Sequence, residues 1–242
     1  MKETTKLAGE FVLIVVGVLV ALAVETAFED RADERLRDEY IARIKLDIES
    51  DKRGIGFRVD FFGDVQRFSE EFLLWLDRDD PVDQDILLAS FYAAEIWPFV
   101  PAVDTYQDLQ NTGNIRLLDD IDLRTSLSMY YHKASRSRSG WAPTENFRTY
   151  IRSVIPHYVQ DLIRTNCPTT DKLDEEPTGF PSCSLPDVDY AALTALYEPL
   201  KADVEFRRWL NYRHSEVGVM VYLLSQQSVF ADEVLQQIDE QE

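Results

Sequence analysis

The sequence is poor in glycine and histidine, and each shortage excludes a class of site. The nine glycines are scattered, and none forms the GxGxxG or GxxxxGK[ST] loop that cradles phosphate. The three histidines, His132, His157 and His214, are too far apart to form an HxxxH or HExxH zinc motif. We therefore predict no catalytic residue, no metal site and no cofactor.

Positive charge is also scarce. The chain has 25 lysines and arginines against 44 aspartates and glutamates, a formal net charge of −19. Such a surface is a poor partner for nucleic acid and for anionic lipid headgroups. The hydrophobic content of 45% and the aromatic content of 12% are too high for a disordered chain. The sequence therefore indicates a folded, acidic protein that does not bind nucleic acid.

No stretch alternates between apolar and polar residues over a convincing strand length, and no repeat of fixed period occurs. Helical periodicity dominates instead. Between residues 31 and 51, apolar side chains recur every three or four positions, which is typical of one face of an amphipathic helix. They are Leu36, Tyr40, Ile41, Ile44 and Ile48. The pattern predicts an all-α fold.

Glycine and proline suggest where the helices end. We expect the first break at residues 52–56, KRGIG, and a second helix along Phe57, Phe61, Val65, Phe68, Phe72 and Trp75. Further helices are expected at 82–94, 103–110, 119–139, 142–162 and 188–197.

Particular residues are expected to shape the ends of these later helices. Gly113 suits a left-handed C-cap, and Asp119 or Asp120 can cap the helix that follows. Pro156 should split the helix in which it lies. We expect Asp187 to open a short helix and Pro199 to begin the last long one.

One apolar run stands out at the N-terminus. Residues 11–24, FVLIVVGVLVALAV, carry no charge. Taken with their neighbours, residues 7–28 form a helix of roughly 33 Å, about one hydrocarbon thickness. Ala21-Leu22-Ala23 resembles a signal-peptide cleavage site, so a cleaved signal is the alternative. We expect a retained membrane anchor.

Four residues in this segment are candidate interaction residues. Glu10 and Glu25 lie roughly 22 Å apart along a helix, near the two expected interfaces, where a carboxylate is tolerated or pairs with a cation on a partner helix. Gly17 and Ala21 form a GxxxA pair that suits close packing against another membrane helix. The alternative for that pair is ordinary small residues facing lipid.

The two cysteines, Cys167 and Cys183, flank one loop rich in proline, and its ends can meet. A disulfide closing such a loop contributes about 3 kcal/mol in the chain-entropy model and requires an oxidising compartment. The count of lysine and arginine around the anchor is slightly higher after it, which favours a cytoplasmic body. We give the cysteines more weight and predict a periplasmic body with a cytoplasmic N-terminus.

Two other patterns resemble reactive or metal-binding sites. His214-Ser215-Glu216 contains the residues of a nucleophile relay, but neighbours on a helix point in different directions. Aspartates at 77, 79, 80, 83 and 85 surround Pro81, yet the glycine and terminal glutamate of a calcium loop are missing. We interpret this cluster as a solvated turn, with a weak calcium site as the alternative.

Two stretches carry a recognisable pattern, FVLIVVGVLVALAVETAFEDR and TYQDLQNTGNIRLLDDIDLRTSLSMYY. Together they resemble an uncharacterised family of bacterial single-span, membrane-anchored helical proteins, and the first stretch is similar to that family's "IVxGVLIAL" anchor. In the second, the family pattern falls on Leu109, Gly113, Leu117, Leu123-Arg124 and Tyr130-Tyr131. The resemblance covers about a quarter of the chain. It implies an inner-membrane location and a helical body, and it implies no chemistry.

These patterns predict a membrane anchor at 1–28, an acidic helical extension at 29–53, and a soluble helical domain at 54–242 with a loop at 165–186. We expect a non-catalytic accessory or scaffolding subunit that binds lipid and other integral membrane proteins of a larger complex. Energy-transducing complexes, respiratory or photosynthetic, are candidate hosts. The alternatives are a periplasmic ligand-binding or sensing module and a hydrolase that uses His132 or His214.

Overall fold

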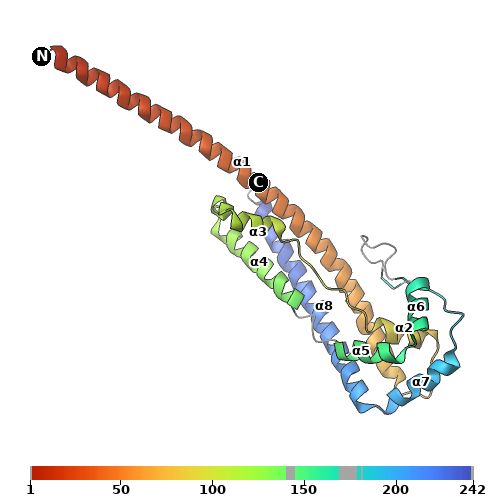
Figure 1. The fold of residues 1–242 in the computed structure, drawn as a ribbon. Coiled ribbons are helices and arrows are strands. Elements are labelled where there is room, and N and C mark those ends of the chain that lie inside the picture. Colours follow the sequence, from red (N-terminus) through yellow and green to blue (C-terminus); the bar gives the residue numbers. More distant parts are fainter. Residues whose placement is uncertain (1, 140–144, 169–178, 181, 241–242) are drawn as a thin grey trace. The chain divides into compact units, whose positions relative to one another are not determined.

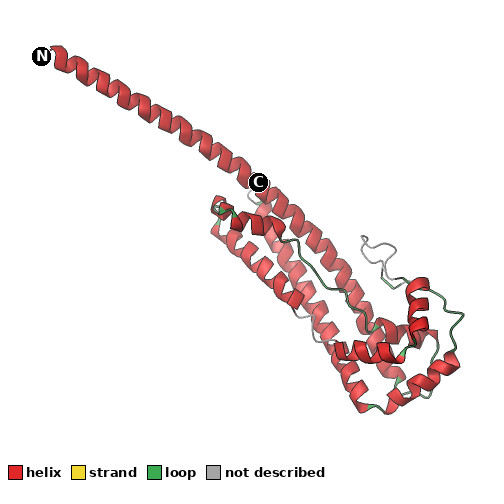
Figure 2. Cartoon of the chain, in the orientation of Figure 1, coloured by secondary structure: helices red, strands yellow, loops and turns green. Residues whose placement is uncertain are grey.

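The computed structural model describes residues 2–139, 145–168, 179–180 and 182–240 (Figure 1). For helix residues 2–12, 136–139 and 145 it describes the backbone alone. Throughout this described part the regular elements are helices, and no strand occurs (Figure 2). The predicted all-α fold is confirmed.

The elements follow one another with short connections, apart from the longer segment between α6 and α7. In chain order they are α1 (Lys2–Trp75), α2 (Gln84–Tyr92), α3 (Asp104–Asn111), the 3-10 helix η1 (Asn114–Leu117), α4 (Ile121–Ser139), α5 (Glu145–Val154), α6 (His157–Asn166), α7 (Tyr190–Ala202) and α8 (Val204–Asp239). The chain divides into two compact units: Met1–Asp47 with Val103–Thr125, and Ile48–Ala102 with Ser126–Glu242.

The expected break at residues 52–56 is absent, because α1 runs on from Lys2 to Trp75. Each interior glycine costs a helix about 1 kcal/mol relative to alanine. Ile55 lies between Gly54 and Gly56 and is fully buried, so its packing outweighs that cost. The division between the two units falls at Asp47 and Ile48, inside α1.

In the first unit, the apolar stripe predicted on α1 is buried at Tyr40, Ile41 and Ile44. The Tyr40 hydroxyl donates to Asp108 Oδ2 of α3 at 2.8 Å. Gly113 has a φ of 75°, the left-handed conformation expected of it. Its position between α3 and η1 turns the chain, so this part of the sequence prediction is correct.

The second unit is built around a cluster of aromatic rings. Phe72 stacks on Trp75 with ring centroids 5.7 Å apart and meets Phe206 edge-on at 5.9 Å. Trp75 meets Tyr197 of α7 at 6.0 Å. The last turns of α1 therefore pack against α7 and α8, and α5 also contacts α8 (Figure 1).

Helix boundaries follow local capping chemistry. Asp120 caps α4 by accepting from the backbone N–H groups of Asp122 and Leu123, as predicted, and Pro156 separates α5 from α6. Two expectations were wrong. Asp189, not Asp187, caps α7.

The second error concerns the start of the last helix. Pro199 lies inside α7, and α8 begins at Val204 with Asp203 as its N-cap. Asp203 Oδ1 accepts from the backbone N–H groups of Glu205 and Phe206, which are donors that the first turn of a helix otherwise leaves unpaired.

The residues of the family-like pattern serve the packing of each unit. Leu109, Leu117 and Leu123 are buried in the first unit. In the second unit, Tyr130 is buried and its hydroxyl donates to Asp51 Oδ2 at 2.9 Å. The pattern therefore marks structural positions in this fold.

Candidate functional site

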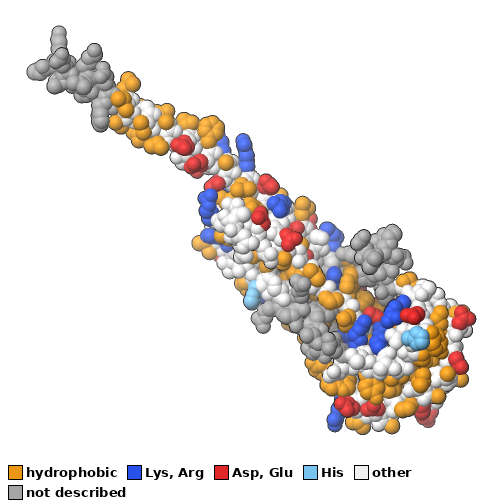
Figure 3. Space-filling view, viewed as in Figure 1, with side chains coloured by type: hydrophobic (Ala, Val, Ile, Leu, Met, Phe, Trp, Pro, Cys, Tyr) orange, Lys and Arg blue, Asp and Glu red, His pale blue; other side chains and the backbone are white. Residues whose placement is uncertain are grey.

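The N-terminal part of α1 carries apolar side chains on all sides. Every residue from 13 to 32 is exposed, and Leu13 retains 75% of its surface and Phe28 65%. Figure 3 shows this stretch of α1 as largely hydrophobic, followed by the first acidic groups. A helix that is apolar all round is typical of a protein core or a membrane span, not of a helix in water.

The residues predicted to act in this segment are open to contact where they are described. A methyl group added at Gly17 would meet no atom within 4 Å, and Ala21 and Glu25 are exposed. Glu10 and the other side chains before Leu13 lie outside the described residues. Over the residues that can be assessed, no helix meets the length and hydropathy needed to cross a membrane.

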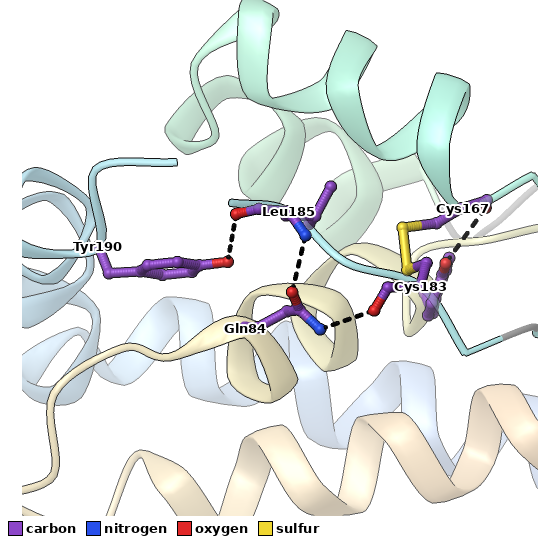
Figure 4. The surroundings of a disulfide bond; sticks show 6 residues. Gln84, Cys167, Cys183, Leu185 and Tyr190 are labelled. Atoms are coloured by element: carbon purple, nitrogen blue, oxygen red, sulfur yellow. Dashed lines mark hydrogen bonds between the residues drawn. A yellow bond between two sulfur atoms is a disulfide. The ribbon is translucent and has the colours of Figure 1, made fainter. Parts of the chain in front are cut away.

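Cys167 and Cys183 form a disulfide in the second unit, as predicted (Figure 4). The segment after Cys183 is held to α2 by one side chain. Gln84 donates through Nε2 to the Cys183 carbonyl at 3.0 Å and accepts at Oε1 from the Leu185 N–H at 2.8 Å. Tyr190 adds a bond from its hydroxyl to the Leu185 carbonyl at 3.2 Å. The disulfide and these bonds fix the end of the loop, of which residues 169–178 and 181 lie outside the description.

The three histidines lie in different surroundings. His132 and His157 are exposed. His214 Nδ1 lies 2.9 Å from Ser69 Oγ, a contact that the sequence did not suggest. Ser69 is fully buried and its hydroxyl also donates to the Gln66 carbonyl at 2.7 Å, so it is closed to a substrate. This pair joins α8 to α1 within the second unit.

Two aspartates of the aspartate-rich turn stabilise neighbouring helices. Asp83 caps α2 by accepting from the Ile86 N–H. Asp77 forms an ion pair with Arg207 of α8, and this hydrogen-bonded guanidinium lowers the pKa of Asp77. Across the described residues, no group of three or more His, Cys, Asp or Glu side chains is arranged to hold a metal ion.

A buried charge cluster at the C-terminal end of α2 was missed by the sequence analysis. Arg213 Nε donates to the Ala93 carbonyl at 2.9 Å, and Arg152 donates to the Phe91 carbonyl at 3.1 Å and pairs with Glu95. Burial lowers the pKa of both arginines to about 10, so both stay charged at neutral pH. Arg213 supplies a donor to the Ala93 carbonyl at the helix end, and Arg152 adds a donor to the Phe91 carbonyl, which also accepts from the Ala94 N–H.

An open groove of about 880 Å³ runs along α8 in the second unit. Its apolar lining includes Tyr212, Val219, Leu223, Val229 and Phe230, all of α8. Lys133 of α4 borders the groove and lies 4.0 Å from the centre of the Phe230 ring. The groove combines an apolar floor with a charged edge, a composition suited to binding another surface.

Comparisons with known proteins assign no identity to this chain: no family model, no curated protein and no solved structure matches it.

Proposed function

We propose that this chain is a non-catalytic, membrane-anchored accessory subunit that binds other integral membrane proteins. The observation that carries the proposal is the exposed apolar segment at residues 13–24 of α1. Nine of its twelve side chains are Val, Leu or Ile. Burying each contributes roughly 1.5–3 kcal/mol. Leaving them all in water therefore costs on the order of 10 kcal/mol, comparable with the whole stability of a domain.

A lipid bilayer is the environment that removes this cost. The apolar sequence continues on the N-terminal side to Phe11, and residues 7–28 together have the length of one span. Glu10 and Glu25 would lie near the two interfaces, where a carboxylate reaches water. The acidic residues that follow in α1 suit the aqueous side.

The disulfide supports a body on the oxidising side of the inner membrane, with the N-terminus in the cytoplasm. Disulfides persist in the periplasm and are rare in the cytosol. The acidic surface supports protein partners over nucleic acid. The host complex is then a bacterial membrane assembly, for which an energy-transducing one, respiratory or photosynthetic, is our working choice.

Anchoring is tested by fractionation of cells that express the full chain. We expect the wild-type chain to stay with alkali-washed membranes. The pair Val16→Arg and Val20→Arg should release it, because each arginine at the centre of a span costs roughly 2.5–3.5 kcal/mol. Leu46→Arg, at an exposed position farther along α1, is the matched control and should stay in the membrane. A wild-type chain found free in the soluble fraction would overturn the anchor.

Partner binding is tested by gentle detergent extraction. The wild-type chain should purify with a defined set of integral membrane proteins, and Gly17→Leu with Ala21→Leu should lose them while remaining in the membrane. Ala23→Leu makes a comparable change on another side of the same segment and should keep them. Purification of the wild-type chain without any other membrane protein would refute the accessory role.

The groove on α8 favours a second candidate, a ligand-binding or sensing module, because about 880 Å³ falls in the range of small-molecule pockets. A small molecule that purifies with the chain and raises its thermal midpoint, and whose effect Leu223→Arg removes, would favour this alternative. A hydrolase using His132 or His214 is the third candidate. Replacement of each histidine with alanine that leaves the biological output of the chain unchanged would remove it.

A further inference from the structure

The exposed face of α8 repeats with the period of a coiled coil. Among the residues between 208 and 233, a regularly spaced set of eight is exposed, separated by alternating steps of four and three. They are Arg208, Tyr212, Ser215, Val219, Tyr222, Gln226, Val229 and Glu233, and we call them the α8 stripe. Four of the eight, Tyr212, Val219, Tyr222 and Val229, are apolar or aromatic. Apolar residues placed on a 3.5-residue repeat are what a second helix packs against.

The stripe is separate from the face of α8 that the second unit already uses. Phe206, Leu210, Val217, Leu224 and Val234 are buried on that inner face. The stripe lies on the other side of the helix, because its residues fall about half a turn away at 100° per residue. Val219 is 53% exposed and Tyr222 62%, so both can be covered without disturbing the core.

The order of residues along the stripe identifies its partner. We infer that α8 pairs with α8 of a second copy of this chain in antiparallel orientation. With a two-fold axis between residues 220 and 221, each stripe residue faces a stripe residue of the partner. The four kinds of pair are Arg208 with Glu233, Tyr212 with Val229, Ser215 with Gln226, and Val219 with Tyr222.

Each pair is chemically matched. The three inner kinds of contact are apolar or hydrogen-bonding, and the outermost joins a cation to an anion. Neither Arg208 nor Glu233 has a hydrogen-bond or ion-pair partner among the residues that the structure describes. In a parallel pair, Arg208 would face Arg208 and Glu233 would face Glu233, and like charges in contact are destabilising. The charges therefore select the antiparallel arrangement.

The groove along α8 is a second observation of the same surface. Six of the eight stripe residues line it: Tyr212, Ser215, Val219, Gln226, Val229 and Glu233. A hollow that follows a helix for this length accepts an elongated apolar ridge, and the stripe of a second copy supplies one. A two-fold interface of this kind uses one patch twice, as most homodimers do.

The test measures the mass of the full-length chain in detergent by sedimentation or light scattering. The wild-type chain should contain two copies. Val219→Asp should weaken dimerisation at least about ten-fold, because it places a carboxylate against the partner's Tyr222. Leu74→Asp is the matched control, an equally exposed apolar position on α1 of the same unit (52%), and it should remain dimeric. Unchanged circular dichroism melting of both variants shows that folding is intact.

Charge reversal then tests the antiparallel register. Arg208→Glu alone and Glu233→Arg alone should each raise the dimer dissociation constant several-fold, since each converts two ion pairs into two repulsions. The double variant Arg208→Glu with Glu233→Arg should restore the wild-type constant. A parallel pairing would leave the single variants unchanged, and that result would overturn the proposed register.

This inference does not depend on the membrane anchor, so the two can fail separately. A dimer that persists when no other membrane protein purifies with the chain would support self-association and reject the accessory role. A wild-type chain that stays monomeric at the highest concentration reached, or a dimer indifferent to Val219→Asp, would reject the α8 interface and leave the anchor untouched.

Discussion

Two stretches of the same helix differ in how their apolar residues are distributed. In α1, residues 13–24 are apolar on every side and all are exposed. Residues 55–75 are apolar mainly on one side, and Ile55, Phe62 and Phe72 are fully buried there while Asp60 faces solvent. Both stretches are helical, since both belong to α1. The angular distribution of apolar residues, and not the presence of a helix, decides which environment each stretch requires.

The comparison separates two sources of free energy. The packed stretch stabilises the body through side-chain contacts that already exist in the fold. The exposed stretch has no such contacts in the described structure. Its apolar side chains are stabilised only if another molecule or a lipid phase covers them. Substitutions in the first should change unfolding of the body, and substitutions in the second should change attachment instead.

The largest expected effect distinguishes these two roles directly. Phe72→Ala should reduce the unfolding free energy by about 3–5 kcal/mol, because it leaves a cavity among Trp75, Tyr197 and Phe206. Leu19→Ala in the exposed stretch should change it by less than about 0.5 kcal/mol. Guanidinium unfolding of the detergent-bound chain, followed by tryptophan fluorescence, measures both.

Leu74→Ala is the control within the packed stretch, because Leu74 lies on its solvent side. It should resemble Leu19→Ala in its effect on unfolding. Equal losses for Phe72→Ala and Leu74→Ala would mean that the body does not pack along the face described for it.

Removal of the disulfide should have the next largest effect on the unfolding free energy. Replacing Cys167 and Cys183 with serine opens a loop closed across a sequence separation of 16 and should cost about 3 kcal/mol. Under the proposed anchoring, membrane retention should not change, since the exposed stretch of α1 is untouched. Unfolding curves with and without a reducing agent give the same comparison for the wild-type chain. A variant as stable as the wild type would show that the loop contributes no constraint.

Much of the fold could be predicted from local sequence patterns. The stripe through Tyr40 and Ile44 predicted a buried helix face, Gly113 predicted a left-handed turn, and Pro156 predicted a split between helices. The two cysteines could be paired because they flank one loop and no others compete. In each case the deciding residues lie close together in the chain, so their pattern can be recognised without knowledge of the fold.

What the sequence did not show depends on residues far apart. The continuity of α1 through Gly54 and Gly56 depends on packing around Ile55, which lies in one cluster with Val217 of α8. The arginines at the end of α2 come from α5 and α8, with partners 61 and 120 residues away. The α8 stripe could not be predicted from the sequence, because it mixes apolar with polar residues. Its exposure follows from the burial of the opposite face of α8, which only the structure shows.

Alkaline pH should destabilise the packed body without changing the exposed stretch of α1. Burial and the charge of Glu95 raise the pKa of Tyr92 to about 12, against about 10 in the unfolded chain. The native state therefore keeps a proton that the unfolded state releases between pH 10 and pH 12. This contribution to stability is fully present below pH 10 and is lost as the pH rises through 12.

Tyr92→Phe provides the measurement. Between pH 10 and pH 12 the wild-type unfolding free energy should fall by on the order of 2–3 kcal/mol more than that of the variant. Tyr158→Phe, which removes the hydroxyl of an exposed tyrosine, is the matched control. A variant whose slope equals that of the wild type would show that Tyr92 ionises in the native state as easily as in the unfolded chain.

The smallest expected effect compares one glycine from each stretch of α1. A methyl group added at Gly63 or at Gly17 meets no atom within 4 Å, so alanine fits at both positions without strain. Gly63→Ala should raise the unfolding free energy by about 0.5–1 kcal/mol, because alanine loses less conformational freedom in a helix. Gly17→Ala gains the same helical preference, yet it should leave unfolding of the body unchanged, because residue 17 does not take part in that transition. A rise of equal size for both would mean that α1 unfolds as one cooperative unit from end to end, and the separation of its two stretches would then be lost.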